Sequence, residues 1–313
     1  MSQHDDLDPW AAADFAVPAL SADLETARSN LYSDSHPDAP PEGERWSSWD
    51  GAQHGPTPRP AWVITDLGAV DQDLGILKTG KEADVHVLRR WVPRPSAAAA
   101  GRQIHAAGAD GPQRSVLMAA KRYRSGQHRL FHRDAGYLEG RRVRRSREMR
   151  AMARRTEFGK ELISSQWAFA EFAALEELWG LGLPVPYPVQ IDGTELLMEF
   201  VGDGPVAAPR LAQTRPANDQ LQDVFEQCRR ALSVLAGRGW AHGDLSAYNL
   251  LLHGERVVFI DWPQIVDIIG NPQGPDFLLR DVHNLCSWFR TRGLAVDEDE
   301  LFGDLMAQAA ARW

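Results

Sequence analysis

Cysteines are scarce in this chain and long apolar runs are absent. Cys228 and Cys286 are the only cysteines among 313 residues, too few for a disulfide framework or a cysteine-rich zinc site. No stretch of 18 apolar residues is free of charge, and the acidic N-terminus lacks the apolar core of a signal peptide. We therefore expect a cytoplasmic protein with free buried thiols and no membrane partner.

Acidic residues are concentrated at the N-terminus. Residues 1–50 contain eleven Asp and Glu and two Arg, which accounts for the whole net charge of −9. Residues 1–60 are also rich in Ser, Ala and Pro, so we expect an acidic, disordered tail with short helical turns at most. The part that follows is balanced in charge and long enough for two lobes with a core.

Strand patterns come first and helix patterns later. Alternation predicts strands at ADVHVLRRWV and SVLMAAKRY, joined by a long Pro/Gly/Ala-rich loop, and short hairpins around Asp192–Gly193 and His253–Gly254. Apolar residues at helical spacing predict helices over 160–180 and about 218–238. The fold class is α+β and two-lobed, with domain 61–313 divided into a β-rich N-lobe (about 61–198), a hinge (about 199–204) and a small helical C-lobe (about 205–313).

The stretch from His242 to Asn249 reads H-G-D-L-S-A-Y-N. Asp244 precedes Asn249 by five residues, and Asp261 follows the predicted hairpin that returns the chain beside Asn249. This set suits phosphoryl transfer, because one carboxylate orients the attacking hydroxyl while an amide and a second carboxylate bind Mg²⁺. The pattern therefore predicts Asp244 as catalytic and Asn249 and Asp261 as metal ligands.

A phosphoryl-transfer site also needs groups that hold a triphosphate. Lys121 ends a predicted strand in A-A-K. The following helix offers Glu171, Glu176 and Glu177 as its partner, and Glu171 is the expected one because it lies on the buried side. The G-x-x-x-x-G-K match ending at Lys81 is not a Walker A loop, because Glu82 follows where Ser or Thr is needed. Instead, Thr79, Gly80, Lys81 and Glu82 predict a backbone turn over the nucleotide. Met198 would close the rear of the adenine pocket.

Together these segments resemble the RIO family of atypical protein kinases, closest to its first branch. The resemblance extends from about Leu74 to Phe289 and is carried by these motifs: KTGKEADV, AAKRY, LMEFVG, HGDLSAYN, IDWPQ and LLRDVHN. It implies a trimmed kinase fold without a normal activation loop, using ATP and Mg²⁺, with Mn²⁺ as a substitute. The implied activity is transfer to protein Ser/Thr, itself included, or slow ATP hydrolysis.

The resemblance also implies roles for single residues. Lys121 would bind the α- and β-phosphates, and backbone groups of Glu199 and Val201 would meet adenine. Asp244 would orient the attacking hydroxyl, and Asp261 would bind metal or carry phosphate as an aspartyl-phosphate. The residues expected to support the catalytic loop are His242, Ser246 and Asp281. The chain departs from the family at Lys78 and Asp84, where Ser and Asn are expected, and at Trp262–Pro263.

Arg141–Arg155 contains eight arginines in fifteen residues. Clustered guanidinium groups bind nucleic-acid phosphate, so ribosomal RNA or a ribosome is a candidate partner, besides ATP and an unknown protein substrate. The alternative is a solvated basic helix or loop.

Two other functions remain open. A small-molecule phosphotransferase of the aminoglycoside type also carries H-G-D-x-x-x-x-N, although the T-G-K-E-A loop argues against it. A non-catalytic, ATP-gated assembly factor would bind ATP without transferring phosphate.

Overall fold

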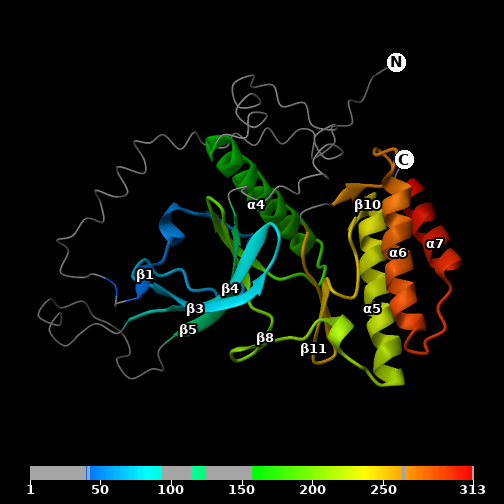
Figure 1. Ribbon diagram of the computed structural model, residues 1–313, viewed down its shortest axis with the longest axis horizontal. Coiled ribbons are helices and arrows are strands. Elements are labelled where there is room, and N and C mark those ends of the chain that lie inside the picture. The colour runs from blue at the N-terminus through cyan, green and yellow to red at the C-terminus, as the bar shows by residue number, and fades with distance from the viewer. Residues whose placement is uncertain (1–39, 41–42, 94–113, 125–156, 263–264, 312–313) are drawn as a thin grey trace, which may run out of the picture.

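The computed structural model describes residues 40, 43–93, 114–124, 157–262 and 265–311. An antiparallel sheet of seven strands forms one lobe, in the order β1-β3-β4-β5-β7-β6-β2. Its strands are β1 (Glu44–Trp46), β2 (Gln53–His54), β3 (Val70–Thr79), β4 (Ala83–Trp91), β5 (Ser115–Tyr123), β6 (Pro188–Asp192) and β7 (Glu195–Glu199). Helix α4 (Glu157–Gly180) crosses one face of this sheet (Figure 1).

Helices dominate the other lobe, where α5, α6 and α7 lie side by side (Figure 1). Their bounds are α5 (Asn218–Gly237), α6 (Gly274–Arg290) and α7 (Glu298–Ala310). Short elements connect them to the sheet: β8 (Gly202–Asp203), β9 (Val206–Ala207), η2 (Leu211–Gln213), β10 (Trp240–Ala241), β11 (Leu250–His253), β12 (Arg256–Phe259) and β13 (Val266–Asp267). The expected α+β, two-lobed layout is therefore present. Among the described residues, no helix is both long and apolar enough to cross a membrane.

The folded part begins earlier than the sequence predicts. Residues 1–60 were expected to form a disordered tail, but β1 pairs with β3, β2 pairs with β6, and η1 (Trp49–Gly51) lies between them. Trp49 is 8% exposed and packs into an apolar cluster with Met118, Tyr187 and Leu197. β1 and β2 are only three and two residues long, too short for an alternating pattern to be recognised in the sequence. They form because they pair with β3 and β6, which are distant in the sequence. Residues 1–39 lie outside the described part.

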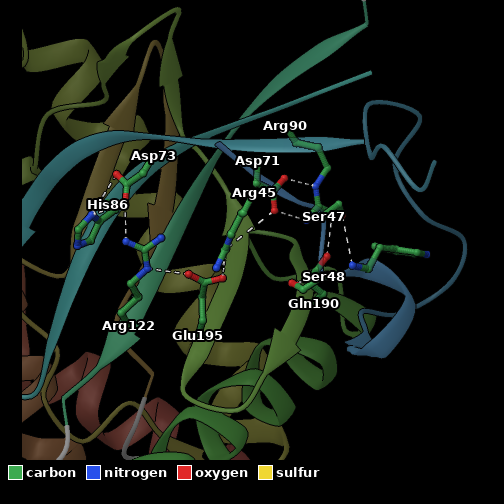
Figure 2. Close-up of polar contacts among 11 residues, drawn as sticks. Arg45, Ser47, Ser48, Asp71, Asp73, His86, Arg90, Arg122, Gln190 and Glu195 are labelled. Carbon is green, nitrogen blue, oxygen red and sulfur yellow. Dashed lines mark hydrogen bonds and ion pairs between the residues drawn. The ribbon is translucent and has the colours of Figure 1, made fainter. Parts of the chain in front are cut away.

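A buried ion pair ties this first segment to the sheet. Arg90 on β4 is fully buried and donates two hydrogen bonds to Asp71 on β3, at 2.7 and 2.9 Å. Its third nitrogen donates to Gln190 on β6, which in turn donates to Ser48 (Figure 2). A buried charge is stable only when it is paired and hydrogen-bonded. The network therefore joins three strands to the residues just before η1.

Two apolar clusters occupy opposite faces of the sheet. The outer one contains Trp49 and Leu88 and is covered by the N-terminal segment. The inner one contains Tyr123 on β5 and Phe172 on α4, and continues into the helical lobe through Leu245 and Phe259. Because cross-strand neighbours share a face, the inner face also carries Lys121. This face positions the candidate site.

Most of the predicted elements agree with the structure. The strand patterns correspond to β4 and β5, and the two turns lie in the hairpins β6–β7 and β11–β12. The helices predicted over 160–180 and about 218–238 are α4 and α5. The sheet ends at Glu199, after which the chain enters the helical lobe. The predicted loop from 93 to 114 is described only at its ends.

Candidate active site

A buried carboxylate holds the lysine at the end of β5. Lys121 Nζ donates to Glu171 Oε1 at 2.7 Å, and Glu171 on α4 is 1% exposed. The Tyr123 hydroxyl donates to the other oxygen of Glu171, and the Trp262 backbone N–H donates to Oε1 at 3.3 Å. The structure therefore brings together the lysine and the glutamate that the sequence predicts as partners. Both oxygens of the Glu171 carboxylate accept hydrogen bonds.

The ammonium of Lys121 stays charged although it is buried. Burial opposes the charged form, but Glu171, Tyr123 and Asp261 outweigh it and hold the pKa of Lys121 well above its usual value. Lys121 Nζ also lies 2.9 Å from Asp261 Oδ1. One cation thus joins α4 of the first lobe to the loop after β12 in the second lobe.

Asp261 occupies an unusual backbone position. Its φ is +70°, and it is the single non-glycine residue with positive φ among those described. Asp is one of the residues that tolerate this left-handed region, at a cost that persists where the surroundings hold it. Partial burial would raise the pKa of Asp261, but Lys121, Lys78 and His242 lower it below its usual value. The carboxylate is therefore ionised and directed at Lys121.

The H-G-D-L-S-A-Y-N segment is a loop held by α6. Asp281 is fully buried and accepts hydrogen bonds from the backbone N–H groups of Gly243, at 2.8 Å, and Leu245, at 2.7 Å. These two hydrogen bonds lie on either side of Asp244, which is exposed. Asn284, also on α6, donates to the carbonyl of Leu245 at 3.0 Å. The loop is thus fixed on both sides of Asp244.

Asn249 and Asp261 are adjacent in space. The Ile260 N–H donates to the Asn249 carbonyl at 2.9 Å, which sets the residue after Ile260 beside Asn249. Asn249 Nδ2 donates to the Asp244 carbonyl at 2.9 Å, so the amide group faces the loop that carries Asp244. One carboxylate and one amide oxygen fit Mg²⁺, which takes few protein ligands and completes its shell with phosphate and water. The donor set therefore suits Mg²⁺ carried by a nucleotide.

The other two supporting residues make local contacts. His242 is buried against Trp262, with ring centroids 4.3 Å apart, and its Nε2 lies 3.4 Å from the Ile260 carbonyl. Its Nδ1 is buried without a hydrogen-bond partner among the described residues. Ser246 Oγ accepts from the Tyr248 N–H at 3.3 Å. His242 therefore contacts the residues on both sides of Asp261, whereas Ser246 shapes only its own loop.

The turn between β3 and β4 lies beside the end of β5, where the Glu82 carbonyl accepts from the Arg124 N–H at 2.9 Å. Thr79 pairs with Asp84 across the hairpin, and the Gly80 N–H donates to the Ala83 carbonyl at 2.9 Å. A Cβ at Gly80 would lie 2.9 Å from the same carbonyl oxygen, so a side chain there would force the turn open. Lys81 and Glu82 are exposed at the tip.

The adenine end of the predicted site lies along β7. Met198 pairs with Ala119, two residues before Lys121 on the neighbouring strand, so both share the inner face. Glu199 is held by Tyr187, whose carbonyl accepts from the Glu199 N–H at 2.9 Å. The Val201 carbonyl accepts from the Ala208 N–H at 2.9 Å. These contacts position the backbone where the sheet passes into the second lobe.

Some contributors were not identified from the sequence. Tyr123 and the backbone N–H of Trp262 complete the hydrogen bonds of Glu171, and Asn284 supports the loop that carries Asp244. Tyr123 had a usable signal, because it lies two residues after Lys121 and so shares its face of the strand. The Arg141–Arg155 run lies outside the described residues, so its predicted contact with RNA stays a prediction.

Comparisons with known proteins support one family. A protein-family model described as RIO domain matches residues 111–301, more than half of the chain. The RIO-type serine/threonine-protein kinase Rio1 of Haloferax volcanii is 38% identical over 136 residues, which are 44% of this chain and 46% of that protein. The serine/threonine-protein kinase RIO3 of Mus musculus is 28% identical over 244 residues, which are 77% of this chain and 43% of that protein. The matched part is therefore less than half the length of these two relatives.

Among solved structures, the Rio2 kinase of Chaetomium thermophilum in a complex with ADP, Mg²⁺ and phosphoaspartate aligns with a TM-score of 0.47 at 19% identity. The alignment covers 75% of this chain and 64% of that chain.

Proposed function

The chain belongs to the RIO domain family, and on that premise we propose that it transfers the γ-phosphoryl group of Mg-ATP to a protein Ser or Thr hydroxyl, its own included. The observation that carries this proposal is the placement of Lys121 between Glu171 and Asp261. A lysine that is kept charged on the inner face of the sheet provides a contact for the phosphates. The nearby Asp244, Asn249 and Asp261 supply the rest of a phosphoryl-transfer site.

Each residue has a defined task in this proposal. Lys121 binds the α- and β-phosphates, and the Thr79–Glu82 turn covers them with backbone N–H groups. Asp244 accepts the proton of the attacking hydroxyl as its oxygen bonds to the γ-phosphorus, and the bond to the bridging oxygen of ADP breaks. Asn249 and Asp261 would hold Mg²⁺, which when bound would neutralise the charge on the phosphates. Glu199 and Val201 offer backbone groups to adenine, and Met198 closes the pocket behind it.

A slow ATPase cycle is the finer form of the same proposal. An oxygen of Asp261 attacks the γ-phosphorus, ADP leaves, and an acyl phosphate forms on the side chain. Water then hydrolyses this acyl phosphate and gives its proton to Asp244, which regenerates the free carboxylate. The ionised state of Asp261 in the structure supports its use as a nucleophile.

The test is incubation of purified full-length protein with γ-labelled ATP and Mg²⁺, beside Asp244→Asn and Asp261→Asn. We expect wild type to incorporate label or release phosphate, and both variants to lose about 10²-fold or more in rate. Asp299→Asn is the matched control, because Asp299 is exposed in the first turn of α7, away from the site.

The chemistry of the label separates the two forms. Acid-stable label indicates phosphoserine or phosphothreonine, and label released by hydroxylamine indicates an aspartyl-phosphate. ATP binding with no label and no phosphate release above the Asp244→Asn background would contradict both forms and favour an ATP-gated assembly factor. Transfer to aminoglycosides but not to protein would favour the small-molecule phosphotransferase.

A further inference from the structure

A bulge in β3 turns a second lysine toward the inner face. Ile76 pairs with His86 and Lys78 pairs with Val85, so Leu77 is an extra residue on β3. Without that extra residue, Leu77 would stand opposite Val85 and Lys78 would be displaced to the following position. The bulge therefore determines which side chain faces the site, and it selects the lysine.

Register across three strands places Lys78 in line with Lys121. Lys78 pairs with Val85 on β4, and Val85 pairs with Lys121 on β5. Residues paired in this way project from the same face of a sheet, and strands lie about 4.8 Å apart, so the two lysine Cα atoms are separated by roughly 10 Å. A lysine side chain spans much of that distance, so both ammonium groups can reach one polyphosphate.

The electrostatics of Lys78 agree with this placement. Desolvation of its ammonium and repulsion from Arg210 and Lys121 lower the pKa of Lys78, while Asp261 raises it. These influences fall off with distance, so Lys78 lies in the same charged region as the candidate site. Lys78 and Lys121 both lower the pKa of the Asp261 carboxylate, and Arg210 acts on Lys78. A second lysine beside Lys121 and Asp261 is complementary to the negative charge of a polyphosphate.

We propose that Lys78 is a second phosphate-binding lysine, which contacts the β- and γ-phosphates of the bound nucleoside triphosphate. The inference rests on the proposed function, because it assigns a further contact within the same site. Lys121 approaches from β5 and Lys78 from β3, on the same face of the sheet. A charge-assisted hydrogen bond to phosphate then favours ATP over ADP, and ADP over adenosine.

The test measures dissociation constants for ATP, ADP and adenosine by titration calorimetry in the presence of Mg²⁺. For Lys78→Met, we expect affinity for ATP to fall about tenfold, affinity for ADP to fall less, and affinity for adenosine to stay unchanged. Lys78→Arg should restore ATP affinity to within about threefold of wild type, because it keeps the charge and a donor.

Arg89→Met is the matched control. Arg89 is exposed on β4, shares the inner face by register with Leu117, and lies four residues from Val85. Its substitution also removes one positive charge, so an effect of net charge alone would lower the affinity for ATP equally in both variants. We expect Arg89→Met to bind all three ligands as wild type does.

The outcomes separate this inference from the function it rests on. If wild type binds ATP and Lys78→Met binds ATP equally well, the role of Lys78 is wrong and the proposed function stands. If Lys78→Met lowers the affinity for adenosine as much as the affinity for ATP, Lys78 maintains the fold of the hairpin and does not contact phosphate. If wild type binds no adenine nucleotide, both proposals are wrong.

Discussion

Single carboxylates in this protein serve several partners at once. Glu171 accepts from Lys121, Tyr123 and the Trp262 N–H, and Asp281 accepts from two backbone N–H groups of the loop that carries Asp244. Each is buried, and a buried carboxylate is stable only when its oxygens are hydrogen-bonded. Helical spacing predicts Glu171, and strand spacing puts Tyr123 on the face of Lys121, but the contact with the Trp262 N–H follows only from the packing.

The environment of Asp73 predicts how the free energy of unfolding depends on pH. Partial burial opposes its ionisation, but hydrogen bonds from Arg122, the Gly75 N–H and His86 lower its pKa to about 2. Figure 2 shows Arg122 and His86 beside the Asp73 carboxylate. An unfolded Asp titrates near 3.9, so the stabilisation is complete above that pH and is lost as the pH falls toward 2. Asp73→Asn should lower the free energy of unfolding at pH 7 by about 1 kcal/mol, a value reduced by solvent screening of this partly exposed group.

Urea denaturation at pH 7, 5 and 3 measures the effect of Asp73→Asn. The difference from wild type should be full at pH 7 and 5 and smaller at pH 3. Asp50→Asn provides the control, because Asp50 is exposed in η1. A difference that is the same at all three pH values would show that the carboxylate charge does not contribute.

At the scale of elements, the first segment completes the sheet. β1 and β2 cover its two edges, and η1 between them places Trp49 on the outer face. The Trp49 ring stacks on His54, with centroids 3.8 Å apart, and Arg59 lies 5.2 Å from its centroid. A segment that is unremarkable in its own periodicity thus closes the N-lobe, because its contacts are with residues far along the chain.

Trp49→Ala tests that role. Loss of a buried indole leaves a cavity over the outer cluster, so we expect the free energy of unfolding to fall by about 3 kcal/mol. Chemical denaturation followed by circular dichroism measures this change. Asp50→Ala, at the adjacent exposed position, should change stability by less than about 0.5 kcal/mol. Equal stabilities of Trp49→Ala and wild type would mean that the segment is not part of the domain.

At the scale of the whole molecule, the two lobes meet at the candidate site. Lys121 of β5 contacts Asp261 after β12, and the inner apolar cluster runs continuously from Phe172 on α4 to Leu245 in the loop that carries Asp244. A ligand that bridges the lobes should therefore stabilise the whole fold. Binding at a concentration one hundred times the dissociation constant adds about 2.7 kcal/mol.

Thermal unfolding with and without Mg-ATP measures this stabilisation. We expect saturating Mg-ATP to raise the Tm of wild type by roughly 5 °C or more. Lys121→Met should lose most of the rise, because it removes the cation that joins nucleotide and both lobes. Arg89→Met should show the full rise. A Tm of wild type that does not respond to Mg-ATP would contradict a nucleotide site between the lobes.

Local patterns in the sequence determined much of this protein. Alternation over 83–91 and 115–123 sufficed for β4 and β5, helical spacing sufficed for α4 and α5, and motif spacing brought Asn249 and Asp261 into one hairpin. Only the tertiary structure decided the pairing of β1 and β2, the bulge that turns Lys78 inward, and the left-handed backbone of Asp261. Periodicity records which residues are buried within an element, whereas register and strain depend on partners that are distant in the sequence.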